Sequence, residues 1–276
     1  MSSYEFETPE PVDLYVELGK GEVEVTASDT TATTVEVEGR DSERVEVRQD
    51  GRQISVIGPK GSRGGGFFGG EQAYTVTINL PVHSNAVLKT GSADIALDGT
   101  FGHGQVKSGS GDCRLDTFDG PLIVETGSGD IVLSRAGAEL RVKSGSGDVD
   151  VAHAEGTLSV STGSGDVEIG TTNGQAVVKT GSGDLEIGRA GDGVSMSTGS
   201  GDMKIGAATR GKFNAKGASG DVMIGIPAGV PVWTDVTTVS GSIHSDLRGA
   251  GQPEPGADYV ELRAKTVSGD IELREV

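Results

Sequence analysis

The chain has 276 residues, of which 46 are glycine and only 4% are aromatic, and its formal net charge is −18. The glycines do not recur every third residue and Val, Ile and Leu return regularly between them, which excludes collagen and a disordered chain. The acidic charge has no basic cluster within it, which excludes nucleic-acid binding, and the single cysteine, Cys113, excludes an intrachain disulfide.

Residues 1–90 are expected to form a β-rich N-terminal capping region. Apolar and polar residues alternate over residues 12–18 and again over residues 74–80, as they do in half-buried strands. Residues 45–54 carry the signal of a β-hairpin with an Asp-Gly turn. The short segment Gly19–Glu22 has the composition of a degenerate corner of the repeat described next.

The N-terminal residues also bear on location. The first ten residues have neither the basic nor the apolar region of a signal peptide, and nowhere do 18 apolar residues run together. We therefore expect a cytoplasmic protein without a transmembrane segment, and association with the cell envelope is the alternative.

Residues 91–225 contain a regular repeat of 18 residues. Each unit reads Ser/Thr-Gly-Ser-Gly-Asp followed by alternating apolar residues, and the same positions hold Val, Ile or Leu in each unit, as at Ile169 and Ile187. Such columns arise when each coil lies directly on the next, and no stretch shows a helical period. The sequence therefore predicts an all-β fold, a parallel β-solenoid (β-helix) of about 18-residue coils.

The Gly-Ser-Gly-Asp element is predicted to be a corner. Inward residues normally differ by two, whereas Ser110 and Cys113 differ by three, which indicates a bend. The aspartate is expected to accept hydrogen bonds within its own turn. Thr162 and Thr180, which precede their corners, are expected to point inward as a ladder of hydroxyls rather than outward as an ice-binding array.

Residues 226–276 are expected to form irregular C-terminal coils and a cap. Ser242 stands where the other corners have an acid, and Asp270 closes the series. Residues 249–256 are predicted to be a loop. Trp233 is expected to close the open end of the core, as terminal repeats often must.

The repeated units Thr126–Leu133, Thr162–Ile169 and Thr180–Ile187 resemble the bacterial putative-adhesin family with β-strand repeats, a domain of unknown function. The opening segment Phe6–Val23 is similar to actinobacterial members without a signal peptide. The resemblance covers nearly the whole chain. It implies a β-solenoid and a role at or near the cell envelope or in the stress response, and it implies no catalytic residues.

The repeated aspartates are the candidate metal site. Carboxylates about 4.8 Å apart repel one another, and a cation such as calcium would relieve this repulsion. Repeat-in-toxin proteins bind calcium on an 18-residue coil with two Gly-Asp corners, whereas this chain has one per coil. We therefore assign no metal site and keep a cation ladder as the less favoured alternative. Its members would be Asp94, Asp112, Asp130, Asp148, Asp166, Asp184, Asp202 and Asp221.

No other pattern indicates catalysis or a cofactor. The sequence contains no nucleophile–base–acid constellation, and Cys113 occupies an apolar column, which favours a buried and inert thiol. The glycine-rich segment 62–70 lacks the Gly-Lys-Ser/Thr ending of a phosphate-binding loop and is expected to be a flexible loop. The histidines share no repeat column and show no metal-ligand spacing; they are His83, His103, His153 and His244.

We therefore expect a non-enzymatic structural or interaction scaffold, a rigid acidic β-solenoid that presents its repeated surface to a protein or cell-envelope partner. One alternative is a filament built by end-to-end stacking of coils, in which the chain would be a homo-oligomer. The irregular residues at both ends favour capping over filaments. A second alternative is a calcium-dependent, adhesin-like module.

Overall fold

The computed structural model describes residues 1–59, 72–248 and 258–276, and this part of the chain is all β except for one 3-10 turn, η1 (Ser42–Arg44). The strands fall into two compact units, Met1–Ala138 and Glu139–Val276, called unit 1 and unit 2 below. The loops predicted over residues 62–70 and 249–256 lie outside the described residues.

The strands of unit 1 are β1 (Ser2–Glu7), β2 (Asp13–Ser28), β3 (Ala32–Glu38), β4 (Glu46–Asp50), β5 (Gln53–Ile57), β6 (Tyr74–Pro81), β7 (Asn85–Phe101), β8 (Gly104–Ser108), β9 (Cys113–Phe118), β10 (Leu122–Thr126) and β11 (Ile131–Ala136). Those of unit 2 are β12 (Leu140–Ser144), β13 (Val149–Ala154), β14 (Leu158–Thr162), β15 (Val167–Thr172), β16 (Ala176–Lys179), β17 (Leu185–Ala190), β18 (Val194–Ser200), β19 (Met203–Ala208), β20 (Gly211–Ser219), β21 (Val222–Ile226), β22 (Val232–Ser240), β23 (Ile243–Ser245), β24 (Val260–Ser268) and β25 (Ile271–Glu275).

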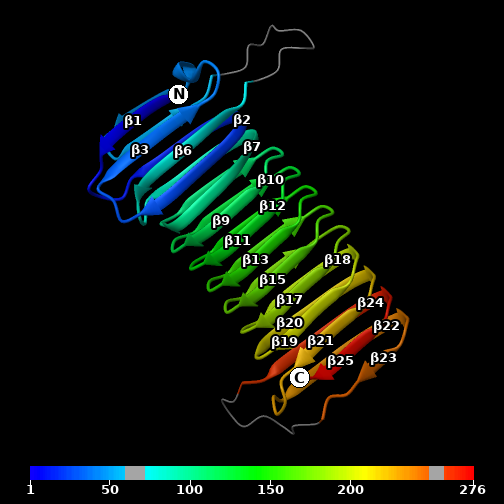
Figure 1. Ribbon diagram of the computed structural model, residues 1–276. Coiled ribbons are helices and arrows are strands. Elements are labelled where there is room, and N and C mark those ends of the chain that lie inside the picture. The colour runs from blue at the N-terminus through cyan, green and yellow to red at the C-terminus, as the bar shows by residue number, and fades with distance from the viewer. Residues whose placement is uncertain (60–71, 249–257) are drawn as a thin grey trace, which may run out of the picture. The chain divides into compact units, whose positions relative to one another are not determined.

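Successive coils of unit 2 stack in parallel and in register, with two strands per coil. Ile169 lies beside Val151 of the preceding coil and beside Ile187 of the following coil, and the other column of strands, β12–β14–β16–β18, follows the same rule. Figure 1 shows these strands side by side along unit 2. The parallel β-solenoid predicted from the 18-residue columns is confirmed, because residues at matching positions are hydrogen-bonded neighbours.

The inward face of each strand forms a narrow core. Alternate residues along β13, β15 and β17 are buried, and Val151, Ile169 and Ile187 have no exposed side-chain surface. In unit 1, Phe101 and Phe118 stack inside the coils with ring centroids 5.3 Å apart. Burial of each such side chain contributes about 1.5–3 kcal/mol, so each coil depends on the coil beside it to cover its apolar residues.

The N-terminal region joins parallel coils to antiparallel strands. β2 pairs in parallel with β7, and Glu22 lies beside Asp94, so the prediction that Gly19–Glu22 is a degenerate corner is confirmed. β1, β3 and β6 pair antiparallel, and β4 and β5 form the hairpin predicted around Asp50. Parallel pairing therefore begins at Asp13, while the domain boundaries set from the sequence stay a prediction.

The C-terminal strands of unit 2 do not stack in chain order. β24 lies between β20 and β22, and β25 lies between β21 and β23 (Figure 1). The coil formed by β24 and β25, which is last in the sequence, therefore lies in space between the coil of β20 and β21 and the coil of β22 and β23. β22 and β23 therefore form the final coil. The prediction that Trp233 closes the core is wrong: its side chain is 51% exposed and lies on the outer side, 5.6 Å from the Arg263 guanidinium.

Candidate functional site

Each corner is built on a buried hydroxyl. Thr162 ends β14, and its Oγ1 accepts a hydrogen bond of 3.1 Å from the Gly165 backbone N–H of its own corner. In the next coil, Thr180 Oγ1 donates to the Gly165 carbonyl at 3.3 Å. The inward hydroxyl ladder predicted from the sequence is confirmed, since these side chains are buried. Ser110, in contrast, is exposed, and Ser108 and Gly111 are buried, so the three-residue step between inward residues lies two residues earlier than the spacing of Ser110 and Cys113 predicted.

The corner aspartates of unit 2 form a ladder that links neighbouring coils. Asp166 Oδ1 accepts a hydrogen bond of 2.8 Å from the backbone N–H of Asp184, and Asp184 Oδ1 accepts one of 2.8 Å from Asp202. The same bond runs from Asp166 N–H to Asp148, and from Asp221 N–H to Asp202. The expected bond within each turn is therefore replaced by a bond to the following coil, while the Ser or Thr hydroxyl caps the turn itself.

The ladder follows the spatial order of the strands rather than the chain order. Asp270 N–H donates to Asp221 Oδ1 at 2.8 Å, and Asp270 Oδ1 then accepts from both the backbone N–H and the hydroxyl of Ser242, at 2.7 and 2.9 Å. The backbone bond first, and the hydroxyl bond second, lower the pKa of Asp270 below its usual value. The stability gained from these bonds is complete above the pKa of the unfolded chain and is lost as the pH falls through the pKa of the folded chain.

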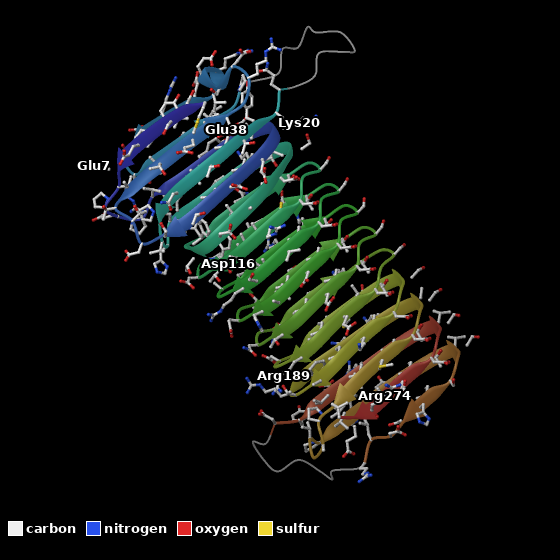
Figure 2. All side chains as sticks on the ribbon, viewed as in Figure 1. Glu7, Lys20, Glu38, Asp116, Arg189 and Arg274 are labelled. Carbon is white, nitrogen blue, oxygen red and sulfur yellow. The ribbon has the colours of Figure 1, made fainter. Side chains whose placement is uncertain are left out.

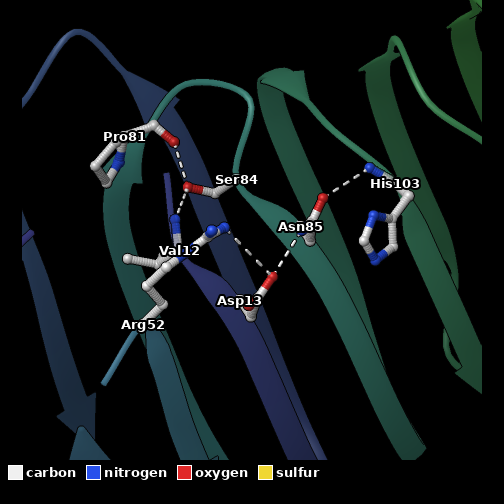
Figure 3. Close-up of polar contacts among 7 residues, drawn as sticks. All are labelled: Val12, Asp13, Arg52, Pro81, Ser84, Asn85 and His103. Carbon is white, nitrogen blue, oxygen red and sulfur yellow. Dashed lines mark hydrogen bonds and ion pairs between the residues drawn. The ribbon is translucent and has the colours of Figure 1, made fainter. Parts of the chain in front are cut away.

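Unit 1 contains its own corner aspartates in the ladder and a second series of hydrogen-bonded polar residues. Asp112 N–H donates to Asp94 Oδ1, and Asp130 N–H to Asp112 Oδ1, both at 2.9 Å. Near the opposite ends of the strands, Asn85 donates to Asp13 at 2.6 Å and accepts from the His103 N–H at 3.0 Å (Figure 3).

The buried Ser84 side chain makes further hydrogen bonds next to Asn85. Its hydroxyl donates to the Pro81 carbonyl at 2.6 Å and accepts from the Val12 N–H at 2.9 Å (Figure 3). Nothing in the 18-residue repeat pointed to this contact, because Val12 and Ser84 lie 72 residues apart in the sequence.

The corner aspartates are not gathered into a metal centre within the described ranges. No group of three or more His, Cys, Asp or Glu side chains able to hold a metal ion occurs among those residues. His83 contacts Asp119 at 3.2 Å, and His244 contacts Asp246 at 3.0 Å, on separate units. A cation along the ladder stays a prediction, and a chelator that lowers the melting temperature would support it.

Cys113 lies in the core of unit 1, as its column predicted. Its side chain is buried, and burial first, with the nearby charges of Asp112 and Asp94 second, raises the pKa of the thiol to about 12. The thiolate is the reactive form, so the folded protein keeps this thiol inert. We expect no labelling by a disulfide reagent at pH 8 in the folded state and complete labelling in guanidinium. Fast labelling of the folded protein would contradict the burial of Cys113.

Removing one ladder carboxylate should weaken the contact between two coils. We expect Asp166→Ala to lower the free energy of unfolding by about 1 kcal/mol, because the Asp184 N–H loses its acceptor. Asp166→Asn keeps an oxygen at this position and should restore most of the loss. Asp150→Ala removes an exposed carboxylate outside the ladder and is the control in urea unfolding. Equal effects of the two alanine variants would contradict the role of the ladder.

The outward residues of unit 2 form columns of their own. Asp150, Glu168 and Glu186 lie in register on β13, β15 and β17, and we call these three residues the acidic stripe. Lys204 follows in the next coil, and its Nζ contacts Glu186 at 2.6 Å. Side chains point outward all along the strands in Figure 2, where the labelled Arg274 belongs to an outward pair with Glu272 at 2.6 Å. The outer surface of unit 2 therefore carries a short run of acidic residues that ends at a basic residue, Lys204.

No helix among the described residues is long and apolar enough to cross a membrane. A comparison with curated proteins gave no match. Solved structures give matches over nearly the whole chain at low identity. A putative adhesin from Parabacteroides distasonis is 13% identical over 99% of this chain and 96% of its own, with a TM-score of 0.52.

Two further structures match with lower TM-scores. A putative adhesin from Parabacteroides merdae is 13% identical over 99% of this chain and 95% of its own, with a TM-score of 0.47. A protein described as a putative lipid binding protein from Parabacteroides distasonis is 16% identical over 99% and 96%, with a TM-score of 0.40. Likeness at this level concerns the fold alone. The family model described as Toastrack DUF4097 matches residues 12–274, and the chain therefore belongs to this family.

Proposed function

We propose that this protein is a non-enzymatic scaffold that presents the repeated outer surface of its coils to a protein or cell-envelope partner. The observation that carries this proposal is that the corner carboxylates form hydrogen bonds between coils. Seven ladder aspartates offer an oxygen to the N–H of a neighbouring coil, as Asp166 does for Asp184. They therefore act in the architecture of the coils, and the outward columns are left as the surface for a partner.

The acidic stripe is the part of this surface with the clearest chemistry. Asp150 and Glu168 are exposed, and the three carboxylates repeat at the spacing of neighbouring strands, about 4.8 Å. A row of like charges fixed on β-strands attracts a basic segment without reorganisation of the scaffold. The net charge of −18 adds long-range attraction for a basic partner, and this attraction weakens as salt rises.

Charge-neutral variants test the stripe directly. The chain with Asp150→Asn, Glu168→Gln and Glu186→Gln should lose a partner that the parent protein retains from cytosolic or envelope extracts. The matched control removes three exposed carboxylates in unit 1, with Glu24→Gln, Glu36→Gln and Glu38→Gln. With the purified partner, we expect Kd to rise about tenfold for the stripe variant, which corresponds to 1.4 kcal/mol, and to change little for the control.

Two results would overturn this proposal. One is equal binding of the partner by the stripe variant and the control variant. The other is the absence of any partner that both copurifies with the parent protein and binds it after purification. The fraction that yields the partner also decides location: a cytosolic partner would agree with the cytoplasmic expectation, and an envelope partner with the alternative.

A further inference from the structure

The final coil of unit 2 has an unpaired edge. Among the described strands, β22 pairs only with β24, and β23 only with β25. The inward side chains of this coil are not fully covered: Ile243 is 47% exposed, whereas its neighbour Ile271 is 0% exposed. Val232 and Val236 are half-buried, whereas Val260 and Ala264 beside them are fully buried. The apolar column thus ends on a surface that another strand could cover.

This edge lacks the charges that protect the outer strands of unit 1. β22 has one charged residue, Asp235, in nine positions. β1 and β4 are also paired on one side only among the described strands, and both are rich in charge. Their charged residues are Glu5, Glu7, Glu46, Arg48 and Asp50. Charged side chains on an edge strand oppose pairing with another chain, so the chain protects the edges of unit 1 and leaves β22 open.

The free hydrogen-bonding groups of β22 can be assigned from its known partner. Val260 N–H donates to the Pro231 carbonyl at 2.9 Å, so Pro231 and the alternate residues after it direct their backbone groups toward β24. The intervening residues direct their N–H and C=O groups away from β24, toward the open edge. These residues are Val232, Thr234, Val236 and Thr238.

We propose that the open edge of β22 binds the same edge of a second copy of this chain, antiparallel and about a two-fold axis at Val236. This register places Val236 opposite itself and Thr234 opposite Thr238. All of these residues have their free backbone groups at the edge, as a hydrogen-bonded antiparallel pair requires. The two open cores would also cover one another, and such a two-fold contact closes with two copies.

The outward side chains favour this register over the one shifted by one residue toward the N-terminus. With Val236 on the axis, Trp233 lies opposite Val239 of the second copy, and aromatic residues pair well with β-branched ones. Both side chains are exposed in the single chain, Trp233 at 51% and Val239 at 78%. Asp235 lies opposite Thr237. A shift of the axis by one residue toward the N-terminus would place Asp235 opposite itself, and like charges directly opposite are destabilising.

Lysine substitutions on the edge strand test the proposal in the 276-residue chain. At about 100 μM, where a small interface is populated, sedimentation should give the mass of a dimer for the parent chain. The double variant Trp233→Lys and Val239→Lys should sediment as a monomer. The matched control, Val132→Lys and Val177→Lys, makes the same change at exposed positions away from this edge and should remain a dimer.

A single cysteine tests the register. Val236→Cys should give a disulfide-linked dimer under mild oxidation, since Cα atoms of a hydrogen-bonded antiparallel pair lie about 5.5 Å apart. Val132→Cys should give none, and the buried Cys113 should not react in either variant. A monomeric parent chain, a dimer that persists in the edge variant, or an assembly that grows with concentration into filaments would overturn the proposal.

Discussion

Replacing Gly165 with alanine is expected to destabilise unit 2 by about 2–3 kcal/mol, a large effect for a single methyl group. An ideal Cβ on Gly165 would lie 2.6 Å from the carbonyl carbon of Gly147 in the preceding coil. The obstacle is backbone, and it cannot rotate away. The two coils would have to separate locally, which would lengthen the Asp166–Asp148 bond beside the corner. Urea unfolding followed by circular dichroism measures the loss.

Ser164→Ala is the matched control for this substitution. Ser164 belongs to the same corner, but its side chain is exposed, so removal of its hydroxyl should change the unfolding free energy by less than about 0.5 kcal/mol. A corner in which Gly165→Ala is as harmless as Ser164→Ala would mean that neighbouring coils are not in close backbone contact. The same clash recurs at Gly129 and Gly183, so the prediction extends to both.

Phe118→Ala should lower the free energy of unfolding of unit 1 by about 3–5 kcal/mol. Phe118 is fully buried, and its ring stacks on Phe101. The ring also packs against Gly104. A Cβ added to Gly104 would clash with this ring and would lie 2.8 Å from Leu122 Cδ1. Deletion of the ring would therefore leave a cavity between neighbouring coils.

Two further variants separate the loss of volume from the loss of the aromatic pair. Phe118→Leu keeps most of the volume and should cost less than half as much as Phe118→Ala. Phe6→Ala removes a half-buried ring from β1 and should also cost less. Thermal unfolding of the three proteins ranks them. A Phe118→Ala protein as stable as the Phe6→Ala protein would contradict the packing described for unit 1.

The coils could be predicted from the sequence because their apolar residues recur every 18 positions. Ile169 and Ile187 occupy the same place in successive repeats, and they are neighbours in the structure because a coil that repeats in sequence also repeats in space. Glu22 and Asp94 show that even an imperfect repeat aligns correctly. The buried position of Cys113 followed from the same column.

The C-terminal order could not be predicted, because the period is lost there. Ser242 follows Asp221 by 21 residues and Asp270 follows Ser242 by 28, so spacing no longer tells which coil lies on which. Chain order is not spatial order in this region, and β24 is inserted between β20 and β22. Trp233 was misplaced for the same reason: without the period, the sequence does not tell which residues of β22 face inward, and Trp233 lies in register with Glu261 on the outward face.

The role of the corner aspartates was half predictable. Their acceptor function followed from residue type, but the donor lies 18 residues away in sequence rather than in the same turn, as for Asp184 and Asp166. The hydroxyl of Thr162 already caps the turn, which leaves the carboxylate free to reach the next coil. The contact of Ser84 with Val12 had no signal at all, because a single serine in a loop carries no periodicity.

Deletion of one whole coil tests most directly whether 18 residues are the structural unit. Removal of residues 167–184 joins Asp166 to Leu185 and restores an intact corner, so this protein should keep cooperative unfolding with a melting temperature close to that of the parent. Removal of residues 167–175 takes half a coil and should abolish cooperative unfolding, because every later strand loses its register. If the two deletions behave alike, the stacked-coil account is wrong.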